Sequence, residues 1–547
     1  MRRLIRGTES SHQRAEGRKM SRKSGSKKGL RARVGGVAAL MAAALLCLGI
    51  GATGAAAIEL EKVEMSYTQP ESTSPLRQAG GHPDITTLFV QKPFKENPFP
   101  PPQIDELMHQ FEIDLPPGLL ANSARFPTCP AAMLKAGPSG NNAVCPIESQ
   151  MGSVQISGVL PIPLPLYNIV PPKGAPALFA ANVLGTVVTV KPTVRPGPHG
   201  YAITMDSGTI SQSLAFNDVM VKFWGVPADE EHNLFRIEYQ DGGLSLFHPS
   251  PAPRQPLTLS PTSCTDQPVS VTARLDGWQS IGQFDEMSID KDMAGEDVLF
   301  NGCEQIKFRP TVEAKPSTTV ADSPSGLDVS IKIPQNEDPD GLSEGHLKDV
   351  KMTLPTGMTV NPSSASGLGS CSPAQIGLVT AVGDSLARFD AAKATCPDSS
   401  KLGTVRVDTA LLANPMPGEV YLAEPKQNPF GSLIALYIVI DDPQSGIRIK
   451  LAGEATPDPK TGQLEVSFPN NPQLPFEEFQ VNLFTGPRAA LKTPVACGTH
   501  TTTSTMVPWA APAIKPVDWN NSYMIDKGPN GACVDSDAAA PNNPTFS

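Results

Sequence analysis

The feature that most constrains this chain is an internal duplication marked by its cysteines. The segment Cys145-Pro-Ile-Glu-Ser-Gln-Met-Gly-Ser-Val matches Cys396-Pro-Asp-Ser-Ser-Lys-Leu-Gly-Thr-Val. Three more anchors recur in the same order: a Leu-Pro-x-Gly before Cys129 and Cys371, a Pro-x-x-Cys at Cys264 and Cys497 with Trp278 and Trp509 beyond, and Asn-Gly before Cys303 and Cys533. We therefore predict two copies of one module, over 76–312 and 313–536.

Eight of the nine cysteines lie within these copies. An even number of cysteines outside the cytoplasm indicates disulfides, and no Cys-x-x-Cys supports a zinc or redox motif. Copies that fold independently pair only within themselves, which leaves three pairings in each. We predict the short-loop pairing, and the nested pairing within each copy stays open as an alternative. The predicted bridges are Cys129–Cys145, Cys264–Cys303, Cys371–Cys396 and Cys497–Cys533.

The N-terminal segment has the pattern of an export signal. Residues 1–33 are rich in Arg and Lys, residues 34–50 are apolar, and Ala55-Ala56-Ala57 precedes a charged stretch. This pattern predicts a signal peptide over 1–57 that is cleaved after Ala57, with an uncleaved anchor as the alternative and Met20 as an alternative start. Residues 58–75 are predicted as an N-terminal extension and 537–547 as a disordered tail. We expect a secreted or cell-surface protein without a membrane partner after cleavage.

The charge distribution excludes nucleic acid as the main partner. Twelve of the 44 basic residues but only two of the 54 acidic residues lie in 1–33, so the remainder carries a net charge of −20. A body this acidic repels phosphate backbones. The sequence does not indicate an oligomeric state.

The fold class follows from short β-branched and apolar runs between Pro, Gly and Asn. The runs are 177–194, 218–224, 269–275, 305–311, 326–333, 432–440, 446–452, 463–468 and 478–484. Ile447, Ile449 and Leu451 alternate with other residues, as in a strand with one wet face. Short helical turns are expected after Cys129 and Cys371, and two or three turns over 385–393. We predict an all-β protein of two tandem antiparallel β-sandwich modules, Greek-key or jelly-roll-like, with one large or two small sandwiches per copy.

Three segments offer candidate chemistry. Gly383-Asp384-Ser385-Leu386 spells the signature of a serine hydrolase family, but no Asp-x-x-His supplies the base that such a serine needs. The run 336–341 opens like a calcium loop yet has Leu347 where a bidentate Glu is required, and an Asx-rich turn explains it as well. A candidate ligand loop follows a strand, with a solvated hairpin as the alternative; it comprises Trp224, Asp229, Glu230, Glu231 and His232. We predict no catalytic residues, no metal site and no cofactor.

Several stretches carry a resemblance to a known family. They are Gly80-Gly81-His82-Pro83-Asp84, Asp114-Leu115-Pro116-Pro117-Gly118, 223–229, 322–327, 335–341 and 472–476. Over most of the mature chain, the sequence resembles a family of large secreted bacterial β-rich proteins with tandem disulfide-containing modules. No activity is assigned to that family, so the resemblance implies the architecture and no site residues.

These observations favour an exported, non-enzymatic protein with a structural, surface-associated or adhesive binding role. Duplication, disulfides, an acidic surface and the missing catalytic pairs motivate this hypothesis. The alternative is a secreted protein that binds or processes glycans through the loop around Trp224, and a serine hydrolase ranks third.

Overall fold

The computed structural model describes residues 58–92, 106–137, 143–157, 162–198, 200–240, 243–384 and 386–539. The predicted signal peptide, Met20, Ser385 and residues 540–547 of the predicted tail lie outside these ranges. Residues 57–547 belong to one compact unit. Within the described ranges, no helix is long and apolar enough to cross a bilayer.

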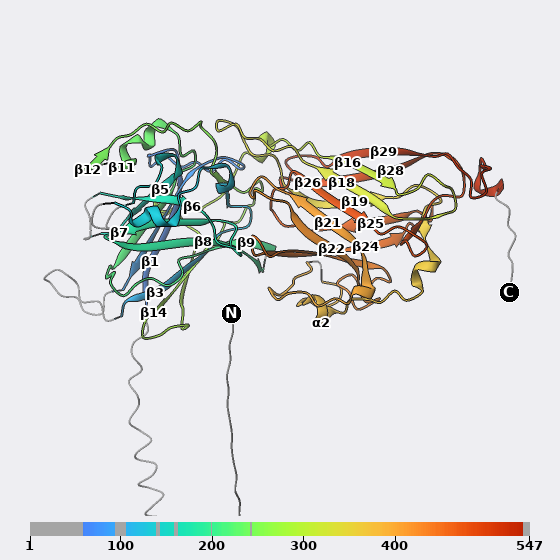
Figure 1. The fold of residues 1–547 in the computed structure, drawn as a ribbon, viewed down its shortest axis with the longest axis horizontal. Helices are drawn as coiled ribbons and strands as arrows, with labels where there is room; N and C mark the ends of the chain where they lie inside the picture. The colour runs from blue at the N-terminus through green and yellow to red at the C-terminus, as the bar shows by residue number, and fades with distance from the viewer. Residues whose placement is uncertain are drawn as a thin grey trace, which may run out of the picture. The chain divides into compact units, whose positions relative to one another are not determined.

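The first copy folds into one antiparallel sheet of 11 strands (Figure 1). In sheet order these are β1 (Leu60–Thr68), β2 (Asp84–Gln91), β10 (Asp218–Phe223), β5 (Gln150–Gln155), β6 (Leu164–Ile169), β7 (Leu178–Val183), β8 (Thr186–Gly197), β9 (Gly200–Asp206), β3 (Met108–Asp114), β14 (Val271–Gly277) and β15 (Asp285–Ile289).

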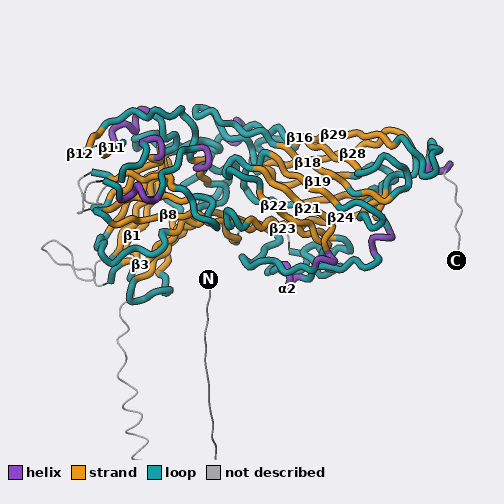
Figure 2. The backbone as a smooth tube through the Cα atoms, in the orientation of Figure 1, coloured by secondary structure: helices purple, strands orange, loops and turns teal. Residues whose placement is uncertain are grey.

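The second copy repeats this topology strand for strand. Its sheet order is β16 (Thr311–Pro316), β18 (Leu327–Lys332), β26 (Glu478–Leu483), β21 (Lys401–Asp408), β22 (Met416–Leu422), β23 (Ala435–Asp442), β24 (Ile447–Pro457), β25 (Leu464–Phe468), β19 (Leu347–Thr353), β28 (Gly498–Pro508) and β29 (Val517–Ile525). The predicted all-β fold with two tandem modules is confirmed, and strands dominate the described chain (Figure 2).

Each sheet curls until its first and last strands touch, which makes it a near-barrel. The Leu60 amide donates to Asp285 Oδ2 at 2.7 Å in the first module, and the Ala314 amide donates to Asn521 Oδ1 at 3.0 Å in the second. Each copy thus has one continuous 11-stranded sheet and not two separate small sandwiches. The contact between the first and last strands covers part of each sheet edge.

Two segments differ from the expected boundaries. Residues 58–75, expected as an extension, contribute β1, whose register with β2 runs from Leu60 to Thr68. The expected boundary at 312/313 falls inside β16. The cysteine anchors that defined the copies begin after these edge strands, so they did not mark them.

Two small sheets also match between the modules. In the first module β4 (Leu120–Ala121) pairs with β13 (Thr258–Leu259), and in the second β20 (Thr359–Val360) pairs with β27 (Leu491–Lys492), which also pairs with β17 (Pro324–Ser325). The hairpin of β11 (Ile237–Gln240) and β12 (Gly243–Leu246) belongs to the first module alone, within the described ranges.

The four predicted disulfides are confirmed, and the nested alternative is not adopted. Cα–Cα separations run from 4.9 Å for Cys371–Cys396 to 6.0 Å for Cys264–Cys303, within the usual range of such bridges. The predicted turns after Cys129 and Cys371 are also present, as a 3₁₀ turn over Ala131–Lys135 and α2 over Pro373–Ile376. The Ser372 hydroxyl caps α2 in a capping box with Gln375.

Candidate functional site

The predicted ligand loop follows β10, but its aromatic ring faces the interior. Trp224 and His232 are fully buried and Asp229 is buried, whereas Glu230 and Glu231 are exposed. The His232 ring stacks on the Trp224 indole with centroids 4.6 Å apart. Because neither ring presents a face to solvent, this arrangement does not provide an open aromatic platform, and ligand binding by this loop stays a prediction.

His232 instead belongs to a buried ionic cluster that sequence analysis missed. Its Nδ1 lies 3.1 Å from Glu71 Oε1, and its Nε2 lies 3.4 Å from Asp84 Oδ1. The Lys222 ammonium bonds Glu71 Oε2 at 2.7 Å, and the Trp224 indole N–H donates to Glu71 Oε1. The cluster thereby ties the segment after β1 to β2, β10 and the loop that follows β10.

The two carboxyl groups of the cluster have opposite pKa shifts. Burial alone would raise the pKa of Glu71, but hydrogen bonds from His232 and Lys222 lower it below its ordinary value. Burial raises the pKa of Asp84, despite the charge of His232 and the amide of Gly225 nearby. Glu71 is the charged anchor of the cluster, since hydrogen bonding to the charged form outweighs its desolvation.

The same cluster is the group of residues best arranged to hold a metal. Glu71, Asp84 and His232 offer ligand atoms within 4.8 Å of one another. These atoms already have partners, however: Lys222 occupies one Glu71 oxygen and the Gly225 amide donates to Asp84 Oδ1. Both carboxyl groups are engaged in ion pairs and hydrogen bonds within the protein, and His232 Nε2 has no hydrogen-bond partner among the described residues beyond its 3.4 Å approach to Asp84. We assign the cluster a structural role.

The two other chemical candidates are placed as follows. In the calcium-like run, Asn336 Nδ2 donates to the Leu342 carbonyl, and Arg254 binds both oxygens of Asp340 at 2.9 Å. The Asp338 and Asp340 amides donate to Asn336 Oδ1 and Asp338 Oδ1, at 3.2 and 3.1 Å, which are the bonds of the Asx-rich turn given as the alternative. The hydrolase candidate rests on Ser385, which lies outside the described residues.

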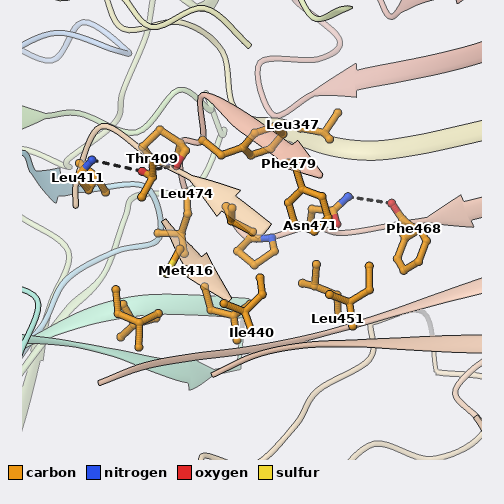
Figure 3. Close-up of a pocket in the computed structure, with 18 of the residues that line it drawn as sticks. Leu347, Thr409, Leu411, Met416, Ile440, Leu451, Phe468, Asn471, Leu474 and Phe479 are labelled. Atoms are coloured by element: carbon orange, nitrogen blue, oxygen red, sulfur yellow. Dashed lines mark hydrogen bonds between the residues drawn. The ribbon is translucent and has the colours of Figure 1, made fainter. Parts of the chain in front are cut away.

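An apolar cavity of about 600 Å³ lies between inward-facing side chains of both modules, most of them from the second. From β18, β19, β22, β23, β24, β25 and β26 come Val329, Val350, Met416, Leu436, Ile438, Ile440, Leu451, Val466, Phe479 and Val481, and from the first module come Phe89, Phe111, Phe179 and Phe223, among others. Charged residues are absent from the lining that the structure describes. Figure 3 shows Met416, Ile440 and Leu451 facing Phe479 and Leu347 across this space.

Strand alternation creates these walls. In β23 the side chains of Leu436, Ile438 and Ile440 line the cavity, whereas Tyr437 and Val439 pack on the opposite face beneath the segment stapled by Cys371–Cys396. Successive side chains of a strand point to opposite faces, so an uninterrupted apolar strand supplies two apolar surfaces. One covers the disulfide-bridged segment and the other lines the cavity.

Four of the six polar residues in the described lining use their side chains in hydrogen bonds within the protein. The hydroxyls of Thr258, Ser364 and Thr409 donate to backbone carbonyls at 2.6 to 2.8 Å. The Asn471 amide donates to the carbonyls of Lys348 and Phe468 at 2.9 Å. Water is retained in a cavity only where polar partners await it, so these walls favour hydrocarbon over water.

The size of the cavity gives the same answer energetically. Leaving apolar volume unfilled costs about 24 cal/mol per Å³ in core truncations. An enclosed apolar space of about 600 Å³ would cost on the order of 14 kcal/mol on this scale, so apolar contents are favoured in the part of the cavity that solvent does not reach.

The cavity opens at the end of the second module where β18, β21 and β23 begin and β22 and β26 end. Leu433 and Val360 line the cavity, yet Leu433 is 67% exposed and Val360 is 40% exposed. Leu368 and Leu402 line the same end and are half-buried. Apolar side chains that line a cavity and also meet solvent mark its mouth.

The other end of the cavity meets the first module. The Tyr201 ring, from the hairpin of β8 and β9, is buried among Val405, Val420 and Ile449 of the second module. Its hydroxyl accepts from the Lys450 amide at 2.7 Å. The modules thus share apolar packing at the inner end of the cavity.

Comparisons with known proteins assign neither a family nor a function. No family model matches the chain, and no curated protein matches it. One solved structure, described as "Biofilm associated protein - B domain", is 8% identical and covers 84% of this chain and 85% of its own, with a TM-score of 0.15. A likeness this distant carries no argument about fold or function, and the family resemblance seen in the sequence stays an expectation.

Proposed function

We propose that this is an exported binding protein that holds an elongated, uncharged hydrocarbon, such as a lipid acyl chain, inside the second near-barrel. The observation that carries the proposal is the cavity of about 600 Å³ with apolar walls and an open mouth. Its volume falls within the range of small-molecule sites, about 300–1,000 Å³. Burial of apolar area supplies the affinity, at about 0.8 kcal/mol for each methylene group.

Two features support export and a binding role. The four disulfides suit an oxidising compartment, since such bridges do not persist in a reducing cytoplasm. The lining offers no grouped acid, base or nucleophile among the described residues, which favours a carrier over an enzyme. The broader expectation of a non-enzymatic binding protein is retained, with a hydrocarbon in place of a surface glycan.

The test is uptake of a neutral fluorescent probe, 1-N-phenylnaphthylamine, by the oxidised mature chain. We expect saturable binding with a blue-shifted emission, and displacement by a long-chain alcohol. In Val481→Trp, the indole occupies part of the cavity and excludes roughly two methylene groups of ligand. Binding should weaken about tenfold.

The matched control is Asn482→Trp, on the same strand but on the exposed face. This variant should bind the probe as the wild type does. Equal binding by both variants, or none by the wild type, would contradict the proposal. Native mass spectrometry of the purified chain would then identify the ligand that copurifies with it.

A further inference from the structure

The mouth of the cavity is surrounded by an exposed apolar surface with two cations. We define this mouth surface by its residues, Val360, Val382, Lys426, Leu433, Phe484 and Arg488. Phe484 is 44% exposed and Val382 is 54% exposed, and neither lines the cavity. Exposed apolar side chains that gather at one place on a soluble protein mark an interaction site.

Hydrogen bonds hold the loops of the mouth surface together. The Gly383 amide donates to the Pro429 carbonyl at 2.6 Å, which joins the Val382 loop to the loop of Lys426 and Leu433. On the other side, the buried Asn361 amide donates to the carbonyls of Pro487 and Ala489, at 3.1 and 2.8 Å. These bonds fix the loop of Phe484 and Arg488 beside the loop that follows β20.

The mouth surface carries two exposed cations, Lys426 and Arg488. Neither Lys426 nor Arg488 has an ion pair among the described residues, although the nearby Lys492 is paired with Asp322. The neighbouring acids are Asp384, which accepts from the Leu386 amide, and Glu424, which accepts from the Gln427 amide. Unpaired cations beside exposed apolar side chains are the composition of surfaces that dock on anionic bilayers.

We infer that the mouth surface docks peripherally on an anionic lipid bilayer, where the cavity exchanges its hydrocarbon with the membrane. This inference rests on the proposed function, because docking places the mouth against the source of the ligand. The apolar side chains enter the headgroup region, and Lys426 and Arg488 meet lipid phosphates. The remainder of the acidic chain is repelled by such a membrane, which orients the protein with its mouth inward. This is the opposite of the expectation from sequence that the mature chain has no membrane partner.

The test is co-sedimentation of the oxidised mature chain with vesicles. Vesicles of phosphatidylcholine mixed with an equal amount of phosphatidylglycerol should bind the chain, and phosphatidylcholine alone should bind it weakly. The double variant Val382→Asp, Phe484→Asp should lose vesicle binding. Arg488→Gln should weaken binding to the anionic vesicles about fivefold and lower its salt dependence.

A matched control uses exposed apolar residues of the first module, Leu184→Asp with Phe247→Asp, which should leave vesicle binding unchanged. The docking variants should take up dispersed 1-N-phenylnaphthylamine as the wild type does, which separates docking from cavity binding. The inference is overturned if the control pair of substitutions also abolishes vesicle binding. It is overturned equally if the chain binds anionic and neutral vesicles to the same extent. Absence of vesicle binding with intact probe uptake overturns docking alone, whereas absence of probe uptake overturns the proposed function.

Discussion

The two modules share one strand order but differ in how their interiors are filled. Strand register identifies the matched positions: Phe89, Phe111, Phe179 and Phe223 of the first module stand where the second has Ile331, Val350, Leu436 and Leu483. The first set packs as aromatic pairs, with ring centroids 4.8 Å apart for Phe89 and Phe111. One exchange runs the other way, with Phe479 where the first module has Val219. Both sets of side chains border the cavity, so with the backbone plan unchanged these exchanges make its first-module part narrower than its second-module part.

The outer ends of the modules differ in the same sense. After β10 the first module places the buried Trp224 on the Glu71 cluster, and a long segment, 224–257, covers the end. After β26 the second module places the exposed Phe484, and only residues 484–490 lead to β27. Register aligns Asp84 with Gly326, so the second module lacks the carboxylate that anchors the cluster. The outer end of the first module is thus tied by the cluster, whereas the second module has no counterpart of Asp84 there.

The largest expected effect is the loss of a buried aromatic ring from the first module. Phe179→Ala should lower the free energy of unfolding by about 3–5 kcal/mol, because its ring is fully buried. The matched Leu436→Ala should cost less, since both side chains border the cavity and Leu436 is the smaller and the more weakly enclosed of the two. Denaturant titration followed by tryptophan fluorescence measures both. Equal costs would show that the second barrel is as tightly packed as the first.

The second module should be the more sensitive to acid, because it has the buried His346 at the position where the first module has Leu107. Both residues accept a hydrogen bond from a matched tryptophan amide, Trp278 to Leu107 and Trp509 to His346. Burial lowers the pKa of His346 to about 4. The folded state keeps this imidazole neutral, whereas the unfolded state binds a proton below about pH 6.5. The free energy of unfolding therefore falls by about 3 kcal/mol between about pH 6.5 and pH 4.

His346→Leu should remove this part of the acid sensitivity. Thermal unfolding of the variant and the wild type, recorded from pH 7 to pH 4, gives the comparison. Parallel curves for the two proteins would place the origin of any acid lability elsewhere in the molecule.

The duplication made much of the fold predictable from sequence. Matched cysteines limited the pairings, and the short-loop choice proved correct in both modules. Local exceptions arose where tertiary contacts override local pattern. Residues 305–311 were expected as a strand, but the bridged Cys303 begins a 3₁₀ turn there, and the strand starts at Thr311. The helix expected over 385–393 is absent from its described residues, because Phe389 forms a β-bridge with Leu378.

The candidate site was less predictable, for two physical reasons. Glu71, Asp84 and His232 lie far apart in the sequence and share no motif, so only the fold brings them together. The cavity depends on the volumes of side chains that face one another across a barrel. Alternation identifies which side chains point inward, but it does not show whether they fill the space. Once strand register is known, the Phe-to-aliphatic exchanges between the copies are the signal that indicates a wider interior in the second copy.

The sealed end of the first module should depend on one carboxylate. Glu71→Gln removes the negative charge that Lys222 and His232 face. This change should lower the free energy of unfolding by about 2 kcal/mol. The expected loss is smaller than for a fully buried ion pair because Lys222 is partly exposed. The pKa of Glu71 is lowered in the folded state, so its contribution is present above about pH 4.5 and is lost as pH falls through the folded value. The difference between variant and wild type should shrink accordingly.

The control for this carboxylate is Glu465→Gln, which removes an exposed pair with Lys351 in the second module. That change should cost no more than about 0.5 kcal/mol. Urea titrations at pH 7 and pH 4 compare the two variants. A cost for Glu71→Gln as small as the control would mean that the buried cluster does not seal the first module.

The smallest effect should come from giving the second barrel a residue of the first. Val350→Phe places a ring where the first module has Phe111, opposite Phe468 on the neighbouring strand. Because the new ring enters the cavity, the free energy of unfolding should rise by up to about 1 kcal/mol through the cross-strand aromatic pair. Uptake of the neutral probe should fall at the same time. The reverse exchange, Phe111→Val, should destabilise the first module and should not reduce probe uptake, because the smaller side chain widens the cavity that Phe111 lines. If Val350→Phe instead lowered the free energy of unfolding by about 1–3 kcal/mol, the ring would be overpacking the interior. That result would show that the second module has no free volume at this position.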